Sequence, residues 1–221
     1  MPADQLEKRA TCTLFGFEYT CRGTTTTAAG TTPTPAPTGG ATTAPAPSPT
    51  GGASTGGASE YRSGSTANDV SDRNGCTPLT VIFARGTSEG GNIGSVAGPP
   101  MFQELLSDLG TSGVSLQGVP YPANSAGNAN CGAAGGSLMA DLVKQALAAC
   151  PNTRIALSGY SQGACVVHNA ASQSGFPTSK VGAVVLFGDP FNGQGVGSVP
   201  ASKVKEICGS SDGICSRGGS Y

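Results

Sequence analysis

The residues with the clearest chemical potential form a short glycine–serine motif in the second half of the chain. Gly159-Tyr160-Ser161-Gln162-Gly163 has the pattern G-x-S-x-G, preceded by a strand-like run and followed by a helix-like one. In that context the serine lies on a tight strand-to-helix turn, where the flanking glycines relieve crowding. The helix N-terminus then points free N–H groups at a developing oxyanion. The motif predicts acyl transfer with Ser161 as the nucleophile.

A serine hydroxyl is a weak nucleophile until a base takes its proton, and that base is normally a histidine oriented by a carboxylate. With this kind of serine turn the chain order is serine, acid, histidine. The acidic candidates after the serine are Asp189, Glu206 and Asp212. Asp189 follows an apolar strand at the sheet edge where sites gather, whereas Asp212 lies between Cys208 and Cys215, whose bridge would fix its carboxylate. The pattern alone does not choose between these two.

The base presents a difficulty, because the only histidine is His168, seven residues after Ser161. If both residues lie on one helix, its rise separates them by roughly 10 Å, too far for the imidazole to reach the hydroxyl. We therefore interpret His168 as a partly buried or solvated helix residue. No histidine follows Asp212, after which nine residues remain.

Apolar patterns predict the elements that must position these groups. Strands are expected at residues 79–83, 154–158, 181–187 and 204–207, and helices at 99–109, 138–147 and about 162–172. Strands that alternate with helices predict an α/β fold with a central, mainly parallel sheet and right-handed crossovers.

Composition divides the chain into parts. Residues 23–59 are 37 consecutive positions of only Gly, Ala, Thr, Pro and Ser, which offer too little apolar surface to offset the entropy of ordering. The 146 residues from Cys76 onward have the size of a single domain. We expect a pro-segment remnant with Cys12 and Cys21 at 1–22, a disordered linker at 23–75 and a domain at 76–221.

Several classes of function are excluded or disfavoured. A net charge of −1 argues against an electrostatic grip on nucleic acid or anionic membrane, and no run of 18 apolar residues could span a bilayer. No CxxC spacing indicates a metal cluster, and we expect neither metal nor cofactor. Eight cysteines and a Thr/Ser/Pro-rich stalk favour secretion. Leu6-Glu7-Lys8-Arg9 looks like the dibasic end of a fungal pro-segment, so a signal upstream is expected.

Taken together, these residues resemble the cutinase family of fungal and bacterial serine esterases. The matching stretches are residues 76–89 (CTPLTVIFARGTSE), 159–163 (GYSQG), 185–190 (VLFGDP) and the segment from Cys208 through Asp212 to Cys215. The resemblance implies a three-layer α/β-hydrolase core and an acyl-serine mechanism. It assigns the nucleophile to Ser161, the acid to Asp212 and the oxyanion donors to Thr87 and the N–H of Gln162. It also implies disulfides Cys76–Cys150 and Cys208–Cys215.

The sequence departs from that family pattern in one respect. Family members carry the catalytic histidine a dozen or so residues after the acid, and no such histidine occurs before Tyr221. We expect the chain as written to hydrolyse esters very poorly. Cys12 and Cys21 could close a small N-terminal loop, whereas a Cys131–Cys165 bridge is conceivable but without support in the sequence.

Three functions remain in competition. The first is a secreted, monomeric esterase that cleaves a hydrophobic cutin-type polyester or short-chain acyl esters, with the linker attaching it loosely to a surface or cell wall. The second, within the same class, is an acetylxylan esterase, which shares the Gly-Tyr-Ser-Gln-Gly motif. The third is an inactive wall or surface protein that retains the hydrolase fold.

Overall fold

The computed structural model describes residues 9–14, 17–22 and 56–215, which fall into two units, Met1–Gly52 and Ala53–Tyr221. In the first unit, β1 (Arg9–Leu14) and β2 (Phe17–Arg22) form an antiparallel hairpin that the sequence did not predict. The expected pro-segment, the pairing of Cys12 with Cys21 and the linker at 23–55 lie outside the described residues and side chains.

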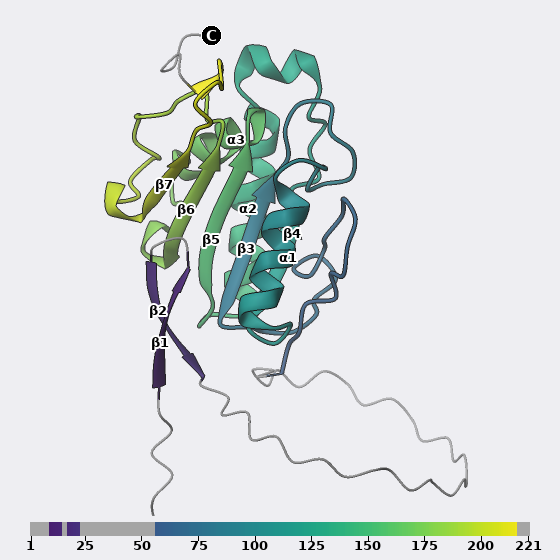
Figure 1. Cartoon of the computed structure of the whole chain (residues 1–221), viewed down its shortest axis with the longest axis vertical. Helices are drawn as coiled ribbons and strands as arrows, with labels where there is room; N and C mark the ends of the chain where they lie inside the picture. The colour runs from purple at the N-terminus through teal and green to yellow at the C-terminus, as the bar shows by residue number, and fades with distance from the viewer. Residues whose placement is uncertain (1–8, 15–16, 23–55, 216–221) are drawn as a thin grey trace, which may run out of the picture. The chain divides into compact units, whose positions relative to one another are not determined.

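The second unit is built around a five-stranded parallel sheet with the order β4-β3-β5-β6-β7 (Figure 1). The strands are β3 (Leu79–Ala84), β4 (Val114–Gly118), β5 (Arg154–Tyr160), β6 (Val181–Phe187) and β7 (Val204–Ile207). The α-helices are α1 (Gly98–Leu109), α2 (Ala133–Ala149) and α3 (Gln162–Ala171). Short 3-10 turns are η1 (Ser125–Asn130), η2 (Thr178–Lys180) and η3 (Ala201–Lys203). The predicted α/β fold is confirmed.

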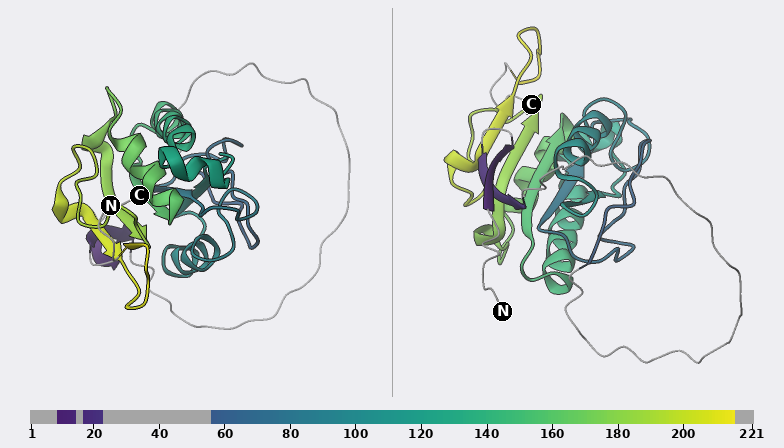
Figure 2. Two further views of the ribbon diagram at one scale, coloured as in Figure 1. Left: turned by 90° about the horizontal axis from the view of Figure 1, so that it is seen from above. Right: turned by 60° about the horizontal axis from the view of Figure 1, so that its bottom comes forward.

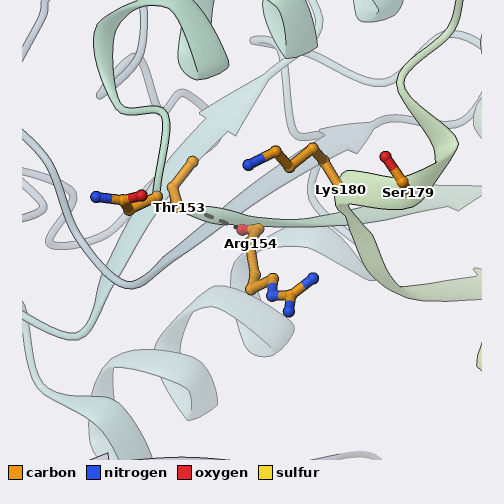
Figure 3. A pocket seen from close by; sticks show the side chains of 5 residues that line it. Thr153, Arg154, Ser179 and Lys180 are labelled. Atoms are coloured by element: carbon orange, nitrogen blue, oxygen red, sulfur yellow. Dashed lines mark hydrogen bonds between the residues drawn. The ribbon is translucent and has the colours of Figure 1, made fainter.

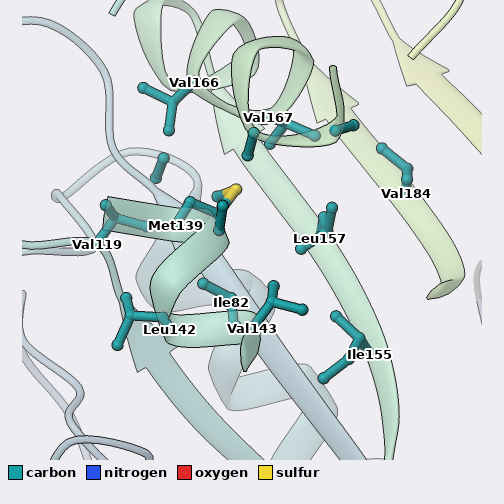
Figure 4. Packing of buried hydrophobic residues seen from close by; sticks show 14 of the residues in the cluster. Ile82, Val119, Met139, Leu142, Val143, Ile155, Leu157, Val166, Val167 and Val184 are labelled. Carbon is teal, nitrogen blue, oxygen red and sulfur yellow. The ribbon is translucent and has the colours of Figure 1, made fainter. Parts of the chain in front are cut away.

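Helices cover both faces of the sheet (Figures 1 and 2). Because side chains alternate along a strand, Ile82 of β3 packs with α2 and α3, whereas its neighbour Phe83 stacks edge-on against Phe102 of α1 at 5.9 Å between ring centroids. Figure 4 shows the α2 and α3 side of this core, where Met139 and Val143 of α2 pack among strand residues. Among the described helices, none is long and apolar enough to cross a membrane.

Residues 56–75 differ from the linker expected there, because they pack onto the sheet unit. The carboxylate of Asp69, which is 3% exposed, accepts hydrogen bonds from the backbone N–H groups of Glu60 (2.9 Å) and Leu116 (2.7 Å). Gln117 of β4 accepts from Val70 N–H at 3.0 Å. A buried carboxylate with two backbone donors is satisfied, so this segment belongs to the folded unit in spite of its polar composition.

The order of the strands creates a topological switch point, where the chain reverses its direction of winding. The chain passes from β3 to the edge strand β4, then returns across β3 to β5 and continues outward to β6 and β7. In open parallel sheets, ligands bind at the carboxyl ends of the strands at such a switch point. Thr87 follows β3 and Ser161 follows β5, so the topology brings both to this switch point.

Leu157 of β5 is fully buried between the sheet and the α2–α3 layer, whereas Leu138 of α2 is 37% exposed. We predict that Leu157→Ala lowers the free energy of unfolding by about 3 kcal/mol, because it removes buried methyl groups and leaves a cavity. Urea unfolding measures this loss. Leu138→Ala is the matched control and should change the free energy by less than about 1 kcal/mol; equal losses in the two variants would contradict the layer assignment.

Candidate active site

Ser161 occupies a strained turn between β5 and α3. Its φ of 53° and ψ of −118° are unusual for a residue with a side chain. Its backbone N–H donates to Phe187 O at 2.9 Å, which fixes the turn to the end of β6. A Cβ on Gly159 would lie 2.2 Å from Gly163 O, and one on Gly163 would lie 2.0 Å from Ala84 O. Only glycine fits either position, as the G-x-S-x-G context requires.

The two expected oxyanion residues meet at an amide that the sequence analysis missed. Thr87 Oγ1 donates to Asn128 Oδ1 at 2.9 Å, and Gln162 Nε2 donates to the same oxygen and to Asn124 O at 3.0 Å. Asn128 belongs to η1, in a Gly/Asn/Ala-rich loop whose composition carries no signal of this role. Gln162 is 2% exposed, so its side chain is held in place below the surface. Its backbone N–H opens α3 and has no carbonyl one turn earlier to bond.

The loop that carries Thr87 is braced by Glu89. The carboxylate of Glu89 accepts from the backbone N–H groups of Gly86 (2.7 Å), Ser95 (2.7 Å) and Val96 (2.8 Å). Arg85 Nε donates to Glu89 O at 2.7 Å, and the guanidinium lies 5.2 Å from the centre of the Tyr121 ring. Charge-assisted bonds to a carboxylate are among the stronger hydrogen bonds in proteins, so this loop is set before any substrate arrives.

Asp212 lies in the loop closed by the Cys208–Cys215 disulfide. Its Oδ1 accepts from the N–H groups of Ile214 (2.8 Å) and Cys215 (3.4 Å). Its Oδ2 is directed at Gly188, where an added Cβ would approach it to 2.8 Å. Gly188 directly follows Phe187, whose carbonyl binds Ser161 N–H. The segment at 187–188 therefore connects the serine turn with the acid loop.

Asp189 and Glu206, the other two acidic candidates, lie together with His168 in a separate cluster. His168 Nε2 is 2.9 Å from Asp189 Oδ2, and Asp189 Oδ1 accepts from Phe191 N–H at 2.9 Å. Of the two states expected for His168, partly buried or solvated, the structure shows a buried side chain. Asp189 is 1% exposed. Asp189 is thus hydrogen-bonded to His168. Among the described residues, neither of the two makes a hydrogen bond to the Ser161 hydroxyl.

Glu206 completes this cluster from β7. Burial and the negative charge of Asp189 raise the pKa of Glu206 to about 7, while His168 lowers it. The donor atoms of the three residues lie within 4.8 Å of one another, so of the described residues they are the set that could share a cation. Within this set, His168 Nε2 and Asp189 Oδ2 are paired directly with each other.

Three disulfides connect described cysteines. Cys76–Cys150 and Cys208–Cys215 have Cα–Cα distances of 5.4 and 6.0 Å, in the pairing that the family resemblance implied. Cys131–Cys165, with a Cα–Cα distance of 5.3 Å, is the pair for which the sequence analysis found no support. It joins the end of η1 to α3, four residues after Ser161.

A polar hollow lies at the end of the sheet formed by the amino ends of the strands (Figure 3). It has a volume of about 330 Å³ and is lined by Asn152, Thr153, Arg154, Ser179 and Lys180. Arg154 begins β5 and Lys180 immediately precedes β6, so the hollow adjoins the amino ends of these strands. It is therefore distinct from the region around Ser161, which lies at the carboxyl ends.

Glu206 makes the stability of the protein depend on pH. Since its folded pKa is raised from 4.5 to about 7, the folded state keeps a proton that the unfolded state loses, and the free energy of unfolding falls as pH rises from about 4.5 to about 7. We predict that Glu206→Gln removes about 1–2 kcal/mol of that fall, a value reduced because the side chain is only half-buried. Urea titrations at pH 4.5, 6 and 8 measure it.

The matched control for this change is Glu104→Gln on the exposed side of α1. It should leave the pH dependence of the wild type in place. A Glu206→Gln variant with the same pH slope as the wild type would contradict the raised pKa.

Comparisons with known proteins show the family to which the chain belongs. The family model described as Cutinase matches residues 75–221. Cutinase 4 from Emericella nidulans is 50% identical over 157 residues, which cover 71% of this chain and 68% of that protein. Trichoderma reesei cutinase in complex with a C11Y4 phosphonate inhibitor is a similar solved structure, with 43% identity, a TM-score of 0.64 and coverage of 72% of this chain and 70% of that one.

A more distant solved structure is an acetylxylan esterase, with 25% identity and a TM-score of 0.51 over 66% of this chain and 88% of that one. Its likeness supports the same fold. The family model covers most of the chain, and the strained serine turn, the braced threonine loop and the bridged acid loop all lie within its matched residues. The chain belongs to the cutinase family of carboxylic ester hydrolases.

Proposed function

We propose that this protein is a secreted carboxylic ester hydrolase that cleaves cutin-type polyester or short-chain acyl esters through an acyl-serine intermediate. One observation carries the proposal: the end of β6 connects Ser161, through the Ser161 N–H to Phe187 O bond, with the neighbourhood of the Asp212 carboxylate. Ser161 Oγ attacks the ester carbonyl. The N–H groups of Thr87 and Gln162 stabilise the oxyanion, and Asp212 orients a histidine.

The 221 residues do not themselves supply that histidine. His168 is the only one, and its Nε2 is bound to Asp189. In a serine triad, Nε2 must face the hydroxyl while the acid binds Nδ1. The proposed roles of Ser161 and Asp212 therefore require an imidazole from outside these residues, and the polypeptide of 221 residues alone is a weak esterase.

We predict that free imidazole rescues the 221-residue polypeptide. With p-nitrophenyl butyrate as substrate, imidazole should raise the serine-dependent rate roughly 10-fold or more, because a general base typically contributes 10²- to 10⁴-fold when positioned and less when free. The rate is measured by release of p-nitrophenolate at increasing imidazole concentrations and should saturate if imidazole binds beside Asp212.

Ser161→Ala is the control, because imidazole itself hydrolyses activated esters in solution. The rescued rate should disappear in Ser161→Ala. It should fall in Asp212→Asn, because the asparagine carries no negative charge with which to orient the imidazole. If wild type and Ser161→Ala give equal rates at every imidazole concentration, the alternative of an inactive wall or surface protein with the hydrolase fold is favoured instead.

The substrate class is the second part of the proposal. The similarity to an acetylxylan esterase keeps acetylated polysaccharide as an alternative substrate, whereas the greater similarity to cutinases favours polyester or acyl esters. We predict that the imidazole-supplied protein releases butyrate from tributyrin faster than acetate from acetylated xylan, measured by titration of the released acid. Faster release from xylan would assign the chain to the second substrate class.

The disulfides support the proposed extracellular location. Bridges such as Cys76–Cys150 form and persist in oxidising compartments and are rare in the cytosol.

A further inference from the structure

The 3-10 turn η1 holds the amide on which both oxyanion residues converge, yet it has no apolar anchor. None of the residues in Ser125–Asn130 is buried, so hydrophobic packing does not fix their position. Nevertheless Asn128 Oδ1 must stay within reach of both Thr87 Oγ1 and Gln162 Nε2. The position of this turn therefore depends on whatever attaches its ends.

Its carboxyl end is attached to helix α3 at two points. The Cys131–Cys165 disulfide is a covalent attachment, and Asn169 Nδ2 donates to Cys131 O at 2.6 Å. Close packing continues in the next residue, since a Cβ on Gly132 would lie 2.7 Å from Val166 Cγ2. Cys165 is 1% exposed, so the bridge is anchored in the core layer.

Helix α3 is also the helix that begins at Ser161. Cys165 lies one turn after the serine, and Asn169 lies one turn after Cys165. The bridge and the Asn169 bond therefore fix η1 relative to the element that carries the nucleophile, and not relative to a distant part of the chain. Small misplacements of groups that orient a reaction cost large factors in rate.

We propose that Cys131, Cys165 and Asn169 are positioning residues for the oxyanion site, which act by holding Asn128 against Thr87 and Gln162. This inference rests on the proposed ester hydrolysis. It assigns to the bridge a role in catalysis beyond stability.

The Cys76–Cys150 disulfide offers an internal control. Cys76 precedes β3 and Cys150 ends α2, at the amino edge of the sheet away from Ser161. This bridge joins residues 74 apart in sequence, against 34 for Cys131–Cys165. Because a longer closed loop removes more entropy from the unfolded chain, its loss is expected to lower Tm more.

The test compares two double variants of the 221-residue protein with imidazole supplied. We expect C131A/C165A to lower kcat for p-nitrophenyl butyrate roughly 10-fold or more with KM changed less than twofold. We expect C76A/C150A to keep kcat within about twofold in spite of the larger fall in Tm. If kcat falls in proportion to Tm in both variants, the bridge is merely structural and the proposal is overturned.

Two further measurements test whether the bridge acts through Asn128: a variant that changes no cysteine, and a double-mutant cycle. Asn169→Ala should lower kcat about 3-fold, the loss of one hydrogen bond. In an Asn128→Ala background, C131A/C165A should cost less than about twofold more, because the bridge acts through Asn128. Full additivity of the two losses would overturn that route of action.

Hydrogen exchange separates failure of this inference from failure of the proposed function. If the wild type shows no Ser161-dependent hydrolysis, the proposed function fails, and exchange of the Gly127 and Cys131 amides, both hydrogen-bonded within the loop, still tests the attachment. Faster exchange in C131A/C165A but not in C76A/C150A supports it. Unchanged exchange in C131A/C165A overturns it.

Discussion

The close approach of the start of α3 to the ends of the sheet strands is the constraint on which the site depends. There is no space for a side chain at Gly159 or Gly163, and the backbone N–H of Ser161 is bound to the last residue of β6. The serine consequently occupies a left-handed backbone conformation that costs of order 1–3 kcal/mol. That cost is tolerated because the largely buried β5 and α3 on either side of the turn, and the bond to Phe187 O, hold the serine in place.

Two polar loops carry the other residues of the candidate site, Thr87 and Asp212. The Thr87 loop is braced by charge-assisted bonds to Glu89, and the acid loop by its disulfide and by backbone donors to Asp212. Neither loop has many apolar side chains to bury, so hydrogen bonds and covalent bridges replace packing there. The sheet and these loops together place groups from distant parts of the chain at the carboxyl ends of the strands.

The sequence predicted the elements of this fold that have a hydrophobic pattern or a characteristic glycine spacing. Continuous apolar runs revealed β6 and the strand before Ser161, and the glycine spacing revealed the turn itself. It missed β4, whose five residues include the polar pair Ser115 and Gln117. It also missed Asn128, because a side-chain amide in a short exposed turn has no periodic or compositional signal. The folding of residues 56–75 depends on buried carboxylate bonds to Asp69, which only three-dimensional proximity reveals.

The pairing of His168 with Asp189 shows why geometry outranks composition in assigning a base. By distance alone it is an imidazole–carboxylate dyad, and its residue types are those of a triad. However, the carboxylate binds Nε2, the nitrogen that a serine would need, and its other oxygen is occupied by Phe191 N–H. Glu206 adds a second, half-buried carboxylate. Burial and the charge of Asp189 raise its pKa to about 7, so that carboxyl group keeps its proton to a higher pH, and this reduces the negative charge of the cluster. The imidazole of this cluster is thus committed to Asp189, and it cannot serve Ser161 without leaving the buried Asp189 carboxylate without its cationic or hydrogen-bonding partner.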